Sequence, residues 1–215
     1  DLSHFVGIID VLSNRSYDVA VECLGLGVDT FPRLKGYHSE FISLLGTLSE
    51  SNWREVKGTF ESGARAIPKV DRPESARFLK LAQKVAVEGE GNLPTFLTEA
   101  ADAFGQLDRS MHNGILNMAE SLANLAPGTV VEFIKSCPSI LTRINDEQLG
   151  VWFAEGIRLV RENDDGGLAY FRVESAHSEE VLDLISSGVE LGRIKDIVRM
   201  YCRALAGATV DIAVT

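Results

Sequence analysis

The side chains that could do chemistry are spread thinly along this sequence. The histidines are isolated, without the H-x-x-x-H or H-E-x-x-H spacing that places two ring nitrogens on one zinc ion; they are His4, His38, His112 and His177. His177 is followed by Glu179 and Glu180, but acidic residues at a helix start stabilise its exposed amides, so capping is the favoured interpretation. We therefore predict no metal-binding residue.

Nucleophiles and phosphate loops are equally sparse. The sequence has no G-x-S-x-G elbow, and Cys23, Cys137 and Cys202 form no C-x-x-C pair, which fits core thiols in a reducing compartment. Cys137 precedes a proline and is expected to end a helix. Gly25-Leu-Gly27 and Gly89-Glu-Gly91 lack the following Lys-Ser/Thr of a P-loop and are interpreted as helix ends. We predict no catalytic residue, no cofactor-binding residue, no cofactor, and no enzymatic activity.

A few residues could instead contact a protein. Trp53 and Trp152 are the only tryptophans, and each is either an anchor in a protein-binding groove or, more commonly, helix-pair core. The aromatic junction from Tyr170 to Ser175 is interpreted mainly as structural, with a contact surface as the alternative. The candidate contact residues are Trp53, Trp152, Tyr170, Glu174, Arg193 and Arg199.

Charge is strongly negative and uneven. The net charge is −10, which disfavours a nucleic-acid partner because phosphate neutralisation needs a surplus of Lys and Arg. Eleven acidic residues and three arginines lie between Asn145 and Glu190. The segment that follows, which includes Arg193 and Arg199, has a positive local charge. Such a stretch is usually a solvated helix face, and the functional alternative is a docking surface for a basic partner.

Helices must position all of these side chains. Apolar residues recur at helical spacing along the chain, most clearly from Leu191 to Leu205, with Gly207 expected to end that helix. Comparable patterns predict helices near 73–85, 94–107, 110–125 and 146–160, and turns at 88–91, 126–128 and 163–167. Only Val210, Ile212 and Val214 alternate as in a strand or an extended exit.

Phenylalanines suggest a repeat. Phe60, Phe96, Phe133 and Phe171 follow one another at 36, 37 and 38 residues, a period between the tetratricopeptide and HEAT lengths. Chance spacing of ten phenylalanines is the alternative. We predict an all-α fold of stacked helix pairs, an α-solenoid of the HEAT or tetratricopeptide kind. Residues 1–207 are the helical-repeat domain, and 208–215 are an extended exit toward a missing downstream domain.

Residues Ala169 to Ile212 resemble a segment of bacterial and archaeal proteins that carry a C-terminal von Willebrand factor type A domain. The matching features are Tyr170-Phe171 followed by Glu-Ser, Gly188-Val-Glu-Leu191, and Tyr201-x-x-Ala-Leu-x-Gly207. The proteins concerned are associated with activation of nitric oxide reductase and carbon monoxide dehydrogenase. The resemblance implies the N-terminal helical region of a cytoplasmic protein acting with a MoxR-type AAA+ ATPase. The family's Asp-x-Ser-x-Ser metal motif does not occur in these 215 residues.

We therefore expect a non-catalytic protein-interaction scaffold, part of a larger protein because no initiator Met is present, without a signal peptide or membrane span. One alternative is an all-helical enzyme or ligand-binding domain with an interhelical pocket built from Glu155, Arg158 and Tyr170. Another is a spacer or oligomerisation element. The sequence leaves the oligomeric state and the binding face open.

Overall fold

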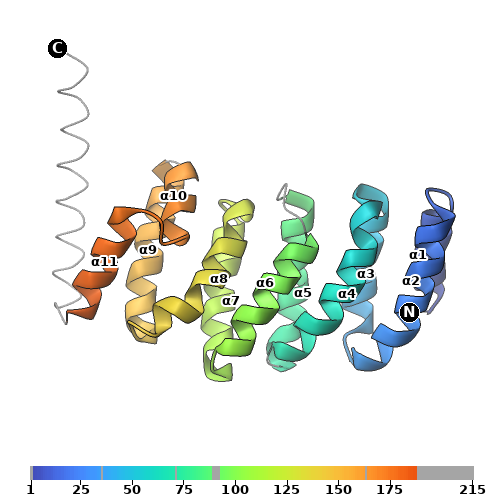
Figure 1. Ribbon diagram of the computed structural model, residues 1–215, viewed down its shortest axis with the longest axis horizontal. Helices are drawn as coiled ribbons and strands as arrows, with labels where there is room; N and C mark the ends of the chain where they lie inside the picture. Colours follow the sequence, from blue (N-terminus) through green and yellow to red (C-terminus); the bar gives the residue numbers. More distant parts are fainter. Residues whose placement is uncertain (1, 35, 71, 89–92, 163, 188–215) are drawn as a thin grey trace, which may run out of the picture. The chain divides into compact units, whose positions relative to one another are not determined.

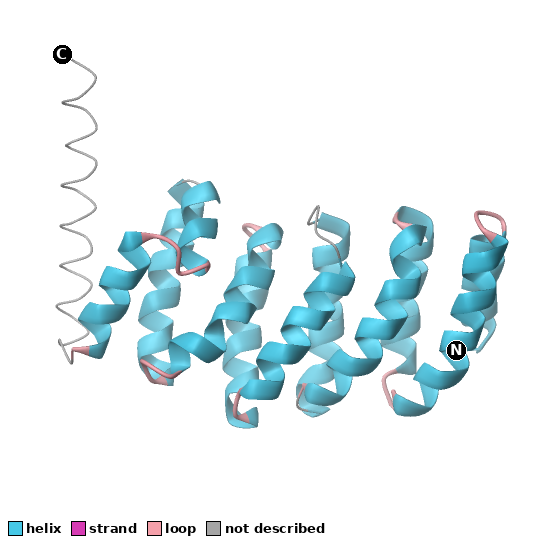
Figure 2. Cartoon of the chain, viewed as in Figure 1, coloured by secondary structure: helices cyan, strands magenta, loops and turns pink. Residues whose placement is uncertain are grey.

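The chain folds into helices joined by short loops (Figure 2). The computed structural model describes residues 2–34, 36–70, 72–88, 93–162 and 164–187, and these contain eleven α-helices and no strand. They are α1 (Leu2–Ser13), α2 (Tyr17–Thr30), α3 (His38–Ser51), α4 (Val56–Ala66), α5 (Ser75–Glu88), α6 (Leu93–Gln106), α7 (Arg109–Ala123), α8 (Val130–Leu141), α9 (Asp146–Glu162), α10 (Asp164–Phe171) and α11 (Ala176–Ser186). The 3-10 turns are η1 (Phe31–Arg33), η2 (Trp53–Glu55), η3 (Ile67–Lys69), η4 (Arg72–Glu74) and η5 (Pro127–Thr129). The prediction of an all-α fold is confirmed for the described residues.

Several predictions fall beyond the last described residue. The helix at Leu191–Leu205, the basic residues Arg193 and Arg199, and the extended exit at 208–215 all lie outside the described residues.

The chain divides into two compact units, Asp1–Pro138 and a second unit that begins at Ser139. In the first unit, contacts run between alternate helices: α1 with α3, α3 with α5, and α5 with α7, and likewise α2 with α4 and α4 with α6 (Figure 1). Because α1 also packs along α2, α3 contacts α4 and α5 contacts α6, the first six helices form three pairs in two layers. The second unit contains α9, with α10 and α11 packed on it.

Aromatic side chains fill the space between the two layers of the first unit. Phe5, Phe41 and Phe78 are 36 and 37 residues apart on α1, α3 and α5, and all three are buried. The four phenylalanines of the predicted repeat are also fully buried, each on an even-numbered helix: Phe60 on α4, Phe96 on α6, Phe133 on α8 and Phe171 on α10. Edge-to-face contacts join neighbouring rings, such as Phe41 and Phe60 with centroids 5.7 Å apart.

Glycines inside the helices allow these rings to approach, and one of them corrects the sequence interpretation. Gly25 and Gly27 were expected to end a helix, but both lie within α2. A Cβ atom on Gly27 would lie 2.6 Å from Cζ of Phe5, and one on Gly63 of α4 would lie 2.5 Å from Cε2 of Phe41. These glycines are therefore required by close packing between the two helices of a pair, which outweighs their low helix propensity.

Two further sequence predictions are wrong. The helix expected to end at Cys137 continues through Pro138 to Leu141, with Ser136 Oγ and Cys137 Sγ both donating to the Phe133 carbonyl in the preceding turn. A proline removes only one backbone hydrogen bond, so the last turn of α8 survives it.

The turn expected at 163–167 is also wrong from residue 164 onward, because α10 begins at Asp164. A Cβ on Gly167 would lie 2.8 Å from the Val160 Cα. The glycine-rich composition therefore serves close contact between α10 and α9 rather than a turn.

Candidate functional site

Glu155 is the centre of the main polar cluster of the second unit. It lies on α9 and is only 8 % exposed. Arg158, one turn along, donates from Nη2 and Nε to the two carboxylate oxygens at 2.7 and 3.0 Å. His177 of α11 donates from Nε2 at 2.8 Å. The carboxylate therefore receives charge-assisted hydrogen bonds from two helices.

These contacts determine the ionisation of the cluster. Burial opposes the charged form of Glu155, but the hydrogen bonds from His177 and Arg158 outweigh it and lower the pKa of the carboxyl to about 2. Burial, with the nearby Glu155 charge, raises the pKa of the Tyr170 hydroxyl well above its usual value. Glu155 is thus anionic at neutral pH and Tyr170 is neutral.

The alternative site proposed from the sequence, Glu155 with Arg158 and Tyr170, is brought together by the fold. Tyr170 stacks on Trp152 with ring centroids 5.1 Å apart and donates to the Trp152 carbonyl at 3.1 Å. Trp152 in turn donates from Nε1 to Ser178 Oγ at 3.2 Å. Because these groups are satisfied by one another across α9, α10 and α11, the arrangement supports packing of the second unit.

The turn between α10 and α11 brings His177 to this cluster. Val173 has φ 57°, and the amides of Val173 and Glu174 donate to the carbonyls of Tyr170 and Ala169. This is the bond pattern of a Schellman cap, with a β-branched residue where glycine is usual. Ser175 then caps α11 by accepting from the Ser178 amide.

The predicted contact residues differ in accessibility. Trp152 and Tyr170 are fully buried, so they cannot touch a partner while the second unit stays folded. Trp53 is half-buried beside the Arg54 guanidinium, and Glu174 is exposed. Only Trp53 and Glu174 are accessible among the predicted contact residues that the structure describes.

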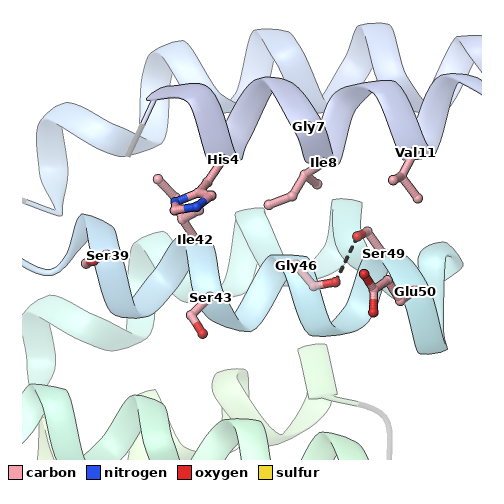
Figure 3. A pocket seen from close by; sticks show the side chains of 10 residues that line it. All are labelled: His4, Gly7, Ile8, Val11, Ser39, Ile42, Ser43, Gly46, Ser49 and Glu50. Carbon is pink, nitrogen blue, oxygen red and sulfur yellow. Dashed lines mark hydrogen bonds between the residues drawn. The ribbon is translucent and has the colours of Figure 1, made fainter.

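A groove with apolar walls lies between α1 and α3 in the first unit (Figure 3). His4, Ile8 and Val11 point from α1 toward α3. The groove has a volume of about 510 Å³, within the range typical of ligand sites. Its lining residues are His4, Gly7, Ile8, Val11, Ser39, Ile42, Ser43, Gly46, Ser49 and Glu50.

Small residues keep this groove open. Gly46 of α3 adds no side chain, and a Cβ on Gly7 of α1 would meet no atom within 4 Å. The next groove, between α3 and α5, measures only about 220 Å³, and Gln83, which lies 37 residues after Gly46, donates to Thr47 Oγ1 at 2.9 Å beside it. Glycine spacing on α1 and α3 could have indicated this groove from the sequence, but the same glycines are also compatible with helix ends.

The groove has a definite chemical character. Ile8 and Ile42 form an apolar floor, each 6 % exposed, whereas Ser43 and Glu50 are exposed at its margin. Glu50 makes no hydrogen bond or ion pair with any described residue. The described residues contain no group of three His, Cys, Asp or Glu side chains able to hold a metal ion. The groove is suited to an aliphatic side chain with a cation beside Glu50.

Comparison of the chain with protein-family models, with curated proteins and with solved structures finds no match. In the described ranges, no helix combines the length and apolar composition needed to cross a membrane.

Proposed function

We propose that this chain is a non-catalytic scaffold of stacked helix pairs, an α-solenoid of the HEAT or tetratricopeptide kind, that binds a segment of a partner protein in the α1–α3 groove. The repeated packing of alternate helices supports the array, because each pair can bury its apolar face only against the next pair. The groove supports the binding role, because it offers an apolar floor with one uncompensated carboxylate.

Long-range hydrogen bonds in the first unit support the repeat. Those in its described part join residues 33 to 43 positions apart, close to the predicted period. The Tyr37 hydroxyl donates to the Arg72 carbonyl at 2.7 Å, and the Leu93 amide donates to Glu55 at 3.1 Å. Each of these bonds connects one helix pair to the next.

The resemblance at residues 169–212 supports a specific setting for this scaffold. In this proposal the chain is the N-terminal region of a cytoplasmic von Willebrand factor type A protein, and its partner is a MoxR-type AAA+ ATPase. The pair would act as a chaperone that matures enzyme complexes.

Filling the groove tests the proposal without weakening the fold. The variant is Gly7→Leu/Gly46→Leu: a Cβ at Gly7 would meet no atom within 4 Å, and a Cβ at Gly46 would meet Ile8 Cδ1 at 3.8 Å, an ordinary contact. Leucine also improves helix propensity over glycine by about 0.8 kcal/mol per site. The binding of a purified MoxR-type ATPase to the full 215-residue chain is measured by calorimetry. We expect the groove variant to raise Kd at least about tenfold while its melting temperature is maintained.

The matched control is Gly114→Leu, an open glycine position on α7. It should bind the ATPase like the parent chain. Equal binding by the groove variant would exclude the groove as the site, and no binding by the parent chain would exclude this partner.

A further inference from the structure

Exposed apolar side chains are concentrated on α1 and α2. Of the eight large apolar residues that are exposed in the described part of the chain, six lie on these two helices. We call this set the end face: Leu2, Val6, Tyr17, Val21, Leu24 and Val28. Leu2, Tyr17 and Val28 are each more than 70 % exposed, at 75, 74 and 72 %. Apolar surface gathered in this way indicates an interaction site.

Helical spacing places the end face on the side of the first pair that is away from its neighbours. Tyr17, Val21, Leu24 and Val28 follow an i, i+4, i+7, i+11 pattern, which is one side of α2. The opposite side of α2 packs on α4, and α1 faces α3 across the groove (Figure 1). The end face therefore lies outside the packed layers of the first unit.

The α3–α4 pair has a surface equivalent to the end face, and that surface is covered by another helix. Thirty-six residues after Val21 and Leu24 come Lys57 and Phe60 of α4, and both contact the first helix pair. There Lys57 pairs with Glu22 at 2.7 Å, and the Phe60 ring packs against Phe5. In the α3–α4 pair, the surface that corresponds to the end face is therefore packed against a helix, α2.

The acidic residues beside the end face indicate what kind of partner could bind there. Helices α1 and α2 contain no Lys or Arg, and their acidic residues are Asp10, Asp18, Glu22 and Asp29. Glu22 is already paired with Lys57, whereas Asp18 and Asp29, next to Tyr17 and Val28, form no ion pair with a described residue. Even with the exposed Arg15 of the α1–α2 turn, a second copy of this surface would bring an excess of carboxylates together, which is unfavourable.

We propose that the end face binds an amphipathic α-helix of a partner protein, whose apolar side packs on Val21, Leu24 and Val28 and whose flanking residues are Lys or Arg. The apolar stripe contributes the contact area, and Asp18 and Asp29 select a basic helix. This inference rests on the proposed scaffold function but concerns a surface separate from the α1–α3 groove.

The test uses two synthetic helical peptides, each about 18 residues long to favour helix formation. Both carry the same leucine stripe, flanked by Lys in one and by Glu in the other, and their binding to the full chain is measured by fluorescence anisotropy. We expect the Lys peptide to bind and the Glu peptide not to bind. Val21→Ser/Leu24→Ser should weaken binding about tenfold or more, since two aliphatic contacts are removed from exposed positions without disturbing the core.

Charge variants separate a specific site from general attraction to an acidic protein. Asp18→Asn/Asp29→Asn should weaken Lys-peptide binding about threefold or more, whereas Glu61→Gln/Glu147→Gln, which removes the same charge from α4 and α9, should not. Equal weakening by both double variants would overturn the inference.

Two further outcomes are decisive. Sedimentation that showed a dimer of the parent chain, abolished by Val21→Ser/Leu24→Ser, would overturn the inference in favour of a second copy. Loss of peptide binding in Gly7→Leu/Gly46→Leu, with full binding by the end-face variants, would also overturn it and leave the groove proposal intact. If the peptide binds at the end face but the ATPase does not bind at the groove, the proposed function is refuted and the end-face inference stands.

Discussion

Replacing Glu155 by Gln should destabilise the second unit far more than the removal of any exposed carboxylate nearby. The amide preserves the shape of the side chain but removes its charge, so Arg158 and His177 lose a partner that is only 8 % exposed. Loss of the charged acceptor from a buried, hydrogen-bonded cluster accounts for most of the cost, although Arg158 keeps its ion pair with the exposed Glu162.

The pKa gives the magnitude and the pH dependence. The ordinary value of 4.5 falls to about 2 in the folded chain, and one pKa unit corresponds to about 1.4 kcal/mol, so the ionised carboxylate contributes about 3 kcal/mol at neutral pH. Because the folded pKa lies below the unfolded one, this contribution is fully present above pH 4.5 and is lost as the pH falls toward 2.

Urea unfolding followed by Trp152 fluorescence measures this effect. Trp53→Phe leaves Trp152, which is fully buried in the second unit, as the single tryptophan. Glu162→Gln is the matched control, because Glu162 pairs with the same Arg158 at 2.5 Å but is 61 % exposed, and such pairs contribute at most about 1 kcal/mol. The reasoning is refuted if Glu155→Gln costs no more than Glu162→Gln at pH 7, or if its cost persists unchanged at pH 3.

Three other outcomes follow from the structure. Gly63→Ala should lower the free energy of unfolding by about 1–3 kcal/mol in urea titrations, since the new Cβ would lie 2.5 Å from a phenylalanine ring; Gly114→Ala, in open space, should raise it by about 0.5–1 kcal/mol. Burial raises the pKa of Cys23 to about 11 and raises that of Cys137 further, so peptide mapping after maleimide treatment at pH 7 should find both unmodified until the chain is unfolded, and rapid native labelling would contradict their burial. Val173→Gly should stabilise the chain by about 1 kcal/mol in thermal melts, because glycine adopts φ 57° without strain, and a lower melting temperature would show that the valine side chain matters more than its backbone.

The sequence predicted the class of the fold because helical periodicity is a local property. Phe60, Phe96, Phe133 and Phe171 were selected by spacing alone, and each is fully buried on a separate helix. The burial of Cys23 as a core thiol was likewise expected. Where one side of a helix is buried, the spacing of its apolar residues is sufficient to identify that side.

Glycine and proline misled the prediction for the opposite reason, since their roles here depend on a partner helix. Gly27 and Gly167 resemble helix ends in sequence, yet they make room for Phe5 and for the Val160 backbone. Pro138 resembles a stop but lies within α8. The groove between α1 and α3 was missed for the same reason. A groove stays open only when neither of the two helices places a large side chain in the space between them.

Glu155 marks the point where the pattern of the first unit changes. Ile8, Leu44, Leu81 and Met118 precede it at repeat intervals of 36 and 37 residues; the first three are buried and Met118 is half-buried. An apolar side chain is therefore expected at this position, and a carboxylate there is stable only with compensation. Arg158 compensates the carboxylate from the same helix, and His177 compensates it from α11. Helix α10 ends at Phe171, and the chain turns through Val173 in the left-handed conformation. The turn directs α11 back to α9, so that the His177 ring lies beside Glu155. The strained turn and the buried charge are therefore linked: the turn places His177 where it donates to Glu155, and Glu155 in turn holds the imidazole of α11 against α9.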